Sequence, residues 1–147
     1  MSIWTGNPTL ESIKTMSQGT MLDHIGIEIT ELGDDYLIGK MPVDHRTVQP
    51  ARILHGGASV TLAESLGSIG AYLSVDRDKF YTVGLEINAN HVRPGTSGFV
   101  YGKATPIHQG RTTQIWEIRI TNEEGKLVCI SRITMAVVKK EHVEKRS

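Results

Sequence analysis

The longest apolar pattern in the chain predicts one central helix. Between Gly57 and Val75, four large apolar residues follow one another at steps of four, three and four, namely Leu62, Leu66, Ile69 and Leu73. This spacing places all four on one face of a helix. We expect that face to pack on a sheet.

Alternating apolar and polar residues predict strands on both sides of this helix. Before it, Ile25, Ile27 and Ile29 alternate, the sequence LGDD predicts a turn, and a second strand resumes through Leu37, Met41 and Val43. After it, glycines, Pro-Gly and the sequence NEEG separate four extended segments at residues 79–94, 98–110, 111–121 and 126–138. The alternation is clearest in the third segment, where one face carries Trp116, Ile118 and Ile120 and the other Glu117 and Arg119.

A short helix is predicted at the start of the chain. Thr9 is a suitable cap, and Leu10, Ile13 and Met16 form an apolar face that ends before Gly19. No repeat or linker interrupts the order of elements. We therefore expect one α+β domain over residues 1–138, in which the only long helix packs on the only sheet, and a charged tail over residues 139–147.

Composition narrows the classes of function. With 147 residues, 39% of them apolar, the chain can form one substantial core, and its 16 acidic and 16 basic residues leave no positive field for nucleic acid. There is no signal peptide and no apolar run of about 18 residues, so we expect no membrane segment. Cys129 lies in an alternating apolar run and is expected to be an inert buried thiol. The absence of a disulfide framework favours the cytoplasm.

The histidines give no sign of a metal site. The six residues are separated along the chain without an HExxH or CxxC pattern, and they are His24, His45, His55, His91, His108 and His142. Metal sites usually need more closely spaced ligands. We expect neither a metal nor a redox cofactor.

Glu64 is unusual because it is the only charged residue between Arg52 and Asp76. It lies about 200° around the helix from Leu62 and Leu66, and so points away from the sheet. Small neutral residues fill much of the helix, and they are Ala58, Ala63, Gly67, Ser68, Gly70 and Ala71. We expect a partner to cover this uncharged face, which would make Glu64 a partly desolvated candidate base or nucleophile. The alternative is an ordinary exposed glutamate.

The sequence His55-Gly56-Gly57 begins the helix and supplies backbone N–H groups that can stabilise a developing negative charge. A plain tight turn is the alternative. An amide donor and a carboxylate together suit acyl transfer. Gly56 and Glu64 are separated by about 12 Å along one helix, too far to act on one carbonyl. We therefore predict a dimer with antiparallel central helices and two composite sites.

Three sequences carry a resemblance to a known family: QP at residues 49–50, LHGGASVTLAESLGS at 54–68 and VGLEINANHVRPG at 83–95. Together they resemble hotdog-fold acyl-CoA thioesterases of the phenylacetic-acid thioesterase-like group, especially the branch of 1,4-dihydroxy-2-naphthoyl-CoA and enterobactin proofreading thioesterases. The likeness extends over residues 10–138. It implies six antiparallel strands around the helix, homodimers that form homotetramers, and an acyl-CoA or aryl-carrier-protein thioester as substrate, with CoA only as part of that substrate.

The resemblance also implies roles for individual residues. Glu64 would be the nucleophile or general base, the Gly56 amide would polarise the thioester carbonyl from the neighbouring subunit, Gln49 and His55 would orient thioester and water, and Ser68 would hold the water or the carboxylate. Family contacts to CoA match Val83, His91, Val92, Arg93, His108, Gln109, Gly110, Arg111, Thr112 and Thr113. His91, Arg93 and Arg111 suit CoA phosphates by charge.

Each role has a structural alternative. Gln49 is also a suitable turn residue, His55 a loop cap and Ser68 a small packing residue, while His91 and Arg93 fit an ordinary strand surface.

The chain departs from the family pattern after QP, where Ala51 and Arg52 replace a common aromatic residue and glycine. The resemblance implies that this segment borders the acyl pocket and that the acyl group is aromatic. Two other functions stay open. One is a hotdog hydratase or dehydratase that uses His55 and Glu64, and the other is a non-catalytic acyl-CoA binding module.

Overall fold

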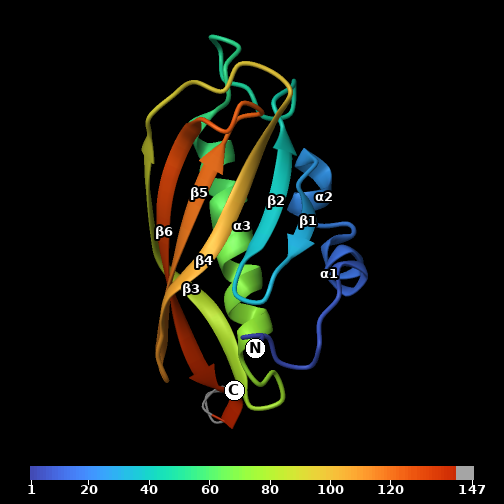
Figure 1. Cartoon of the computed structure of the whole chain (residues 1–147), viewed down its shortest axis with the longest axis vertical. Coiled ribbons are helices and arrows are strands. Elements are labelled where there is room, and N and C mark those ends of the chain that lie inside the picture. The colour runs from blue at the N-terminus through green and yellow to red at the C-terminus, as the bar shows by residue number, and fades with distance from the viewer. Residues whose placement is uncertain (142–147) are drawn as a thin grey trace.

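The computed structural model describes residues 1–141 and contains three helices and six strands (Figure 1). Their order is α1 (Leu10–Ser17), α2 (Met21–Ile25), β1 (Glu28–Leu32), β2 (Leu37–Pro42), α3 (Gly56–Ser74), β3 (Phe80–His91), β4 (Phe99–Gln109), β5 (Thr113–Thr121) and β6 (Leu127–Lys139). The central helix begins one residue earlier than predicted. Most of the predicted charged tail lies outside the described residues.

The six strands form one antiparallel sheet in the order β1-β2-β4-β5-β6-β3. The sheet curves around α3, which contacts every strand from β2 to β6 (Figure 1). This confirms the predicted α+β architecture. The two outer strands are β1, beside α1 and α2, and β3, whose outer edge has no neighbouring strand within residues 1–141.

The predicted apolar stripes form the core. The α3 residues Leu62 and Leu66 are fully buried, and Ile69 and Leu73 nearly so. On β5 the alternation has the predicted effect, because Trp116, Ile118 and Ile120 are fully buried and Arg119 on the other face is exposed. Cys129 is a buried free thiol, and burial raises its pKa.

Four of the small residues in α3 pack on the chain's own sheet, which corrects the prediction that a partner covers them. A Cβ on Gly67 would lie 2.5 Å from Ile133 Cγ2, and one on Gly70 would lie 2.8 Å from Trp116. The other two, Ala63 and Ala71, are fully buried. Their small size lets the curved sheet approach the helix closely. Only Ala58 and Ser68 of this set remain half-buried.

The N-terminal part combines one confirmed and one wrong prediction. Thr9 caps α1 through a capping box with Ser12. Ile25, however, ends the helix α2 instead of beginning a strand. Gly26 stops this helix with a left-handed φ of 80°, and β1 begins at Glu28. The alternation of three isoleucines resembled a strand because α2 is only five residues long.

The first residues cross the C-terminal end of α3. Trp4 stacks on Trp116 with ring centroids 6.1 Å apart and donates from Nε1 to the carbonyl of Gly33. The Thr5 amide donates to the carbonyl of Leu73. These contacts fix the start of the chain to the core. Within residues 1–141, no helix is long and apolar enough to cross a membrane.

Candidate active site

The first turn of α3 has one free amide. His55 caps the helix, since its Nδ1 accepts a hydrogen bond of 2.8 Å from the Gly57 N–H. The N–H groups of Ala58 and Ser59 donate to the His55 carbonyl. The Gly56 N–H donates to no acceptor among residues 1–141. It is therefore available to an acceptor from outside the chain, at the positive end of the helix dipole.

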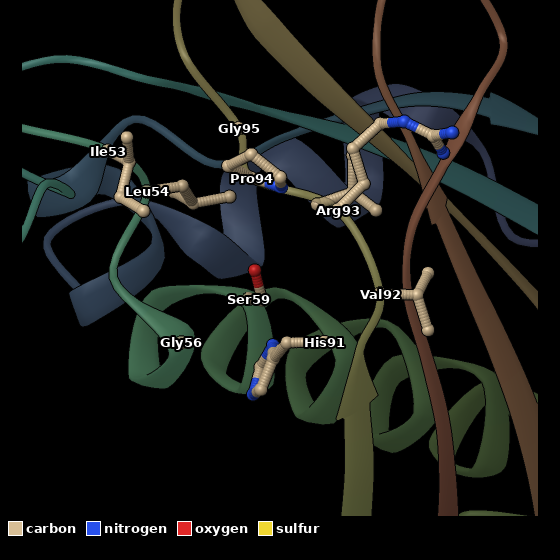
Figure 2. A pocket seen from close by; sticks show the side chains of 10 residues that line it. Ile53, Leu54, Gly56, Ser59, His91, Val92, Arg93, Pro94 and Gly95 are labelled. Carbon is tan, nitrogen blue, oxygen red and sulfur yellow. The ribbon is translucent and has the colours of Figure 1, made fainter.

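A cavity of about 540 Å³ opens beside this amide. Figure 2 shows the His91 side chain over the start of α3, near Gly56 and Ser59. The approach is close, because a Cβ on Gly56 would lie 3.0 Å from His91 Nε2. Arg93 points away from His91 and donates from Nη1 to the Leu127 carbonyl at 2.9 Å (Figure 2). The cavity is lined by four of the predicted site residues, Gly56, His91, Val92 and Arg93.

Gln49 takes part in the turn before α3. Its side-chain oxygen accepts from the Ala51 N–H, its own N–H donates to the Ile53 carbonyl at 2.9 Å, and its carbonyl accepts from Arg52 at 2.8 Å. This is the structural alternative considered for Gln49, and it leaves the side-chain NH₂ group free of partners within the described chain. Arg52 adopts a left-handed φ of 66°, a conformation that glycine adopts at lower cost.

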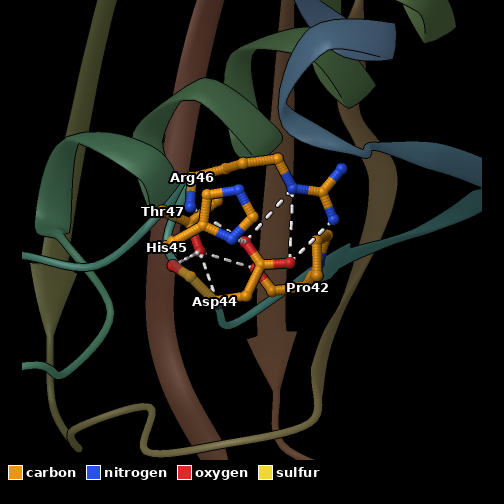
Figure 3. Close-up of polar contacts among 5 residues, drawn as sticks. All are labelled: Pro42, Asp44, His45, Arg46 and Thr47. Carbon is orange, nitrogen blue, oxygen red and sulfur yellow. Dashed lines mark hydrogen bonds and ion pairs between the residues drawn. The ribbon is translucent and has the colours of Figure 1, made fainter.

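A second turn, at residues 44–47, fixes the start of α3 (Figure 3). Thr47 is 2% exposed, and its hydroxyl donates to the Pro42 carbonyl at 2.7 Å and accepts from the Asp44 N–H at 3.2 Å. The Thr47 carbonyl accepts from the His55 N–H at 2.8 Å. The turn thereby connects the end of β2 to the helix cap.

The same turn contains an ion pair. Arg46 Nη2 lies 2.7 Å from Asp44 Oδ2, and the Arg46 N–H donates to Asp44 Oδ1 at 2.9 Å (Figure 3). These two bonds lower the pKa of Asp44 to about 2. The guanidinium also lies beside the C-cap of α2, since a Cβ on Gly26 would be 2.8 Å from Arg46 Nη1. The turn thus joins α2 to the start of α3.

Glu64 and Ser68 line a different cavity, of about 290 Å³. Glu64 lies against β3, because a Cβ on Gly84 would be 3.4 Å from Glu64 Oε1. In this chain the Glu64 side chain is exposed, so the expected desolvation is not present in the single chain. Neither the Glu64 carboxylate nor the Ser68 hydroxyl forms a hydrogen bond with the described residues. Both are free to meet substrate or water.

The remaining predicted CoA contacts lie at the other end of α3. Gln109, Gly110 and Arg111 line a cavity of about 460 Å³ with Ser74 and Val75. Two backbone hydrogen bonds hold the rest of this turn, because the Gly110 N–H donates to the Thr113 carbonyl and the Val137 N–H donates to the Thr112 carbonyl. Two further predicted contacts lie on strands: His108 is exposed on β4, and Val83 is 43% exposed on β3. Since α3 has 19 residues, its two ends are separated by about 28 Å. One chain therefore does not bring the two groups of predicted CoA contacts together.

Within the part of the chain that the structure describes, no three His, Cys, Asp or Glu residues are arranged to hold a metal ion. His142 lies outside the described residues.

Sequence reasoning missed two groups of residues near the site. Thr47 and the Asp44–Arg46 pair fix the helix cap. They were missed because a polar DHRT sequence is compatible with many turn geometries. Met16 and Thr20 line the Glu64 cavity. Their position depends on how α1 packs in three dimensions, which the local pattern does not specify.

Comparisons with known proteins indicate one class of enzyme. Residues 51–129 match the thioesterase superfamily. The chain is 50% identical to the proofreading thioesterase EntH of Cronobacter turicensis, over 92% of this chain and 98% of that protein. It is 48% identical to the 1,4-dihydroxy-2-naphthoyl-CoA hydrolase of Escherichia coli, over 92% and 99%. The crystal structure of a mutant thioesterase from Pseudomonas aeruginosa, 49% identical, superposes with a TM-score of 0.92 over 94% of this chain and 99% of that one.

Proposed function

Because this chain belongs to the thioesterase superfamily and is a thioester hydrolase of the hotdog fold, we propose that it cleaves an aryl-CoA or aryl-carrier-protein thioester to the free acid and thiol. The leading candidate substrate is 1,4-dihydroxy-2-naphthoyl-CoA, which the Escherichia coli relative is named for. This substrate would assign the enzyme to menaquinone biosynthesis. An aryl-carrier-protein thioester is the second candidate.

The observation that carries this proposal is the pair of free groups along α3. The Gly56 N–H is the amide of the first turn without an acceptor in residues 1–141, and the Glu64 carboxylate is likewise without a donor. A thioester carbonyl that accepts from Gly56 gains stabilisation as its oxygen becomes negative. Glu64 supplies the base or nucleophile that the same reaction needs.

Two routes use these groups. In the first, Glu64 takes a proton from water while the water oxygen bonds to the carbonyl carbon, and the C–S bond then breaks and the thiolate leaves. In the second, the Glu64 carboxylate itself attacks the carbonyl carbon, the C–S bond breaks as the thiolate leaves, and water hydrolyses the resulting anhydride to the free acid and the Glu64 carboxylate. Ser68, one turn beyond Glu64, would hold the water or the carboxylate. Single turnover in ¹⁸O-water separates the routes, because label in Glu64 before the product requires the anhydride.

The imidazole of His55 has a defined orientation for either route. Since Nδ1 accepts from Gly57, the neutral ring carries its proton on Nε2. This N–H is then a donor for the thioester or the attacking water. The free side-chain NH₂ group of Gln49 is a second donor beside the same helix end.

The complete site would be formed by two chains. Within one chain, Gly56 and Glu64 line separate cavities, and the predicted CoA contacts lie at opposite ends of α3. An antiparallel second copy places the C-terminal end of its helix beside the N-terminal end of the first. The edge of β3 favours this pairing, because it exposes Val83 and Leu85 at 43% and 61% along an uncovered twelve-residue strand. Two such dimers would form the proposed homotetramer.

The first test is thiol release from a panel of aromatic and aliphatic acyl-CoA substrates. We expect turnover of aromatic substrates by the wild type and a loss of about 10²-fold or more in Glu64→Gln. Glu124→Gln, a surface change in the turn before β6, is the matched control and should retain full turnover. Hydration of an enoyl-CoA without thiol release would favour the hydratase, and tight binding without any thiol release would favour the binding module.

The second test addresses the composite site. Gly56→Pro removes the amide donor, and proline is well tolerated at the first position of a helix. When the inactive Glu64→Gln and Gly56→Pro proteins exchange subunits, a mixed dimer has one site with both intact groups. We expect about a quarter of wild-type activity to return on equal mixing. Activity that stays absent in verified mixed dimers would mean that both groups act from one chain.

A further inference from the structure

The Glu64 cavity has a wall from a distant part of the sequence. On one side lie Glu64, Ser68 and Ile69 of α3, and on the other lie Met16, Thr20 and Leu22 of the α1–α2 segment. Any acyl group whose carbonyl reaches Glu64 through this cavity must pass beside that segment. The α1–α2 segment is therefore placed to select the acyl group.

The wall has few free polar groups. The hydroxyls of Ser17 and Thr20 donate to the carbonyls of Ile13 and Ser17, and the Ser65 hydroxyl donates to the Thr61 carbonyl. These hydroxyl protons are therefore already bonded to backbone carbonyls and are not available to a ligand. Apart from Glu64 and Ser68, the cavity offers an acyl group mainly methyl, methylene and thioether surface, which suits an apolar ring.

The volume sets a size range. A dry apolar cavity of about 150 Å³ holds benzene. In the single chain the Glu64 cavity has about 290 Å³, which leaves room for an aromatic acyl group.

The wall is held to the core by few residues. Among residues 10–25, Ile13 alone has a fully buried side chain. Met16 is 41% exposed. Methionine is unbranched and adapts its shape to neighbours. Met16 can therefore change without opening the core, and its size directly changes the space beside Glu64.

We propose that Met16, together with Thr20, sets the size of the acyl group that this enzyme accepts. The inference rests on the proposed hydrolysis at Glu64. Met16 acts as a specificity-determining residue and takes no part in the chemical step.

The experiment measures kcat/KM for benzoyl-CoA, 2-naphthoyl-CoA and decanoyl-CoA with Met16→Ala and Met16→Trp. Met21→Ala is the matched control, because Met21 is in the same segment, 60% exposed and not in contact with the cavity. We expect Met16→Ala to raise the preference for naphthoyl over benzoyl about tenfold and Met16→Trp to lower it by about the same factor, as size selection in apolar pockets allows. Met21→Ala should match the wild type.

Binding provides a readout that needs no turnover. Met16→Trp should weaken binding of the non-hydrolysable thioether 2-naphthacyl-CoA about tenfold and leave binding of free CoA unchanged. Unaltered preference and binding in both Met16 variants would overturn the inference while wild-type thiol release leaves the proposed function standing. An inactive wild type, or a Glu64→Gln protein of normal activity, would instead remove the proposed function.

Discussion

The start of α3 and the Glu64 cavity are built in different ways. At the start of α3, hydrogen bonds through Thr47, His55 and Gly57 determine where the Gly56 N–H points. At the Glu64 cavity, the wall is a pair of short helices anchored mainly by Ile13. One region depends on directed bonds and the other on packing.

This difference suits the two regions to the different tasks that we propose for them. An oxyanion donor must keep its position within a few tenths of an ångström. A backbone that is fixed by several hydrogen bonds meets this requirement. A pocket for apolar acyl groups needs only a suitable volume, and packed side chains can vary that volume at low cost. Substitutions at the start of α3 should therefore lower the rate, whereas substitutions at Met16 should change selectivity.

The largest expected effect is at the Gly56 amide. Gly56→Pro should lower kcat by about 10²- to 10³-fold, the usual consequence of losing one oxyanion donor. The backbone of His55, with φ −67° and ψ 131°, is already compatible with a following proline. Steady-state thiol release measures this change.

Gly56→Ala is the control for that substitution. Alanine retains the N–H but adds a Cβ 3.0 Å from His91 Nε2, which a side-chain shift of His91 can relieve. We expect a much smaller loss than with proline. Equal losses in the two variants would mean that space beside His91, and not the amide, limits the rate.

The next effect is on stability, at Thr47. Thr47→Val keeps the shape of the side chain but leaves the Pro42 carbonyl and the Asp44 N–H without their buried partner. The free energy of unfolding should fall by about 1–3 kcal/mol. Urea denaturation measures this change. The exposed Thr112 offers a control, Thr112→Val, which should have little effect because the bond from the Val137 N–H uses the Thr112 carbonyl and not its hydroxyl.

His55 allows capping to be separated from chemistry. His55→Ala should lower the free energy of unfolding by about 1 kcal/mol through loss of the cap, while His55→Asn should retain it because asparagine is a good N-cap. Both variants lose Nε2, so both should lose at least about fivefold in kcat/KM. Normal turnover by His55→Asn would limit His55 to a structural role. Thermal unfolding and thiol release together provide the comparison.

The smallest effect concerns pH. The folded-state pKa of Asp44 is about 2, below its ordinary value of 3.8, so its pair with Arg46 stabilises the fold above about pH 4 and is lost as pH falls toward 2. Asp44→Asn should therefore flatten this part of the curve of unfolding free energy against pH. The effect is modest because the Asp44 side chain is one-third exposed. Arg46→Met should flatten the same part, and an unchanged curve in either variant would contradict the assignment.

Much of the fold was predictable because its signals are local. The cap at Thr9, the stripe that includes Leu62 and Leu66, and the alternation on β5 each follow from spacing within one element. The helix α2 was missed because five residues are too few for a helical period. The small residues Gly67 and Gly70 were assigned to a partner's surface because their spacing does not show that Ile133 and Trp116 of the sheet pack directly against them.

The candidate site was predictable only in part. The His55-Gly56-Gly57 sequence indicates a helix start with free amides, and the structure has one free amide there. That Gln49 uses its oxygen within its own turn depends on the backbone path of residues 49–53, which a single sequence does not define. The position of Met16 beside Glu64 depends on tertiary packing. The pairing of two chains stays a prediction.

The stack of Trp4 on Trp116 has a practical consequence for spectroscopy. These two residues are all the tryptophan in the chain, and they lie at the C-terminal end of α3, remote from Gly56. Intrinsic fluorescence therefore reports on the contacts between the first residues of the chain and the core. An emission change on heating would report the loss of these contacts, and the start of α3 would need its own probe.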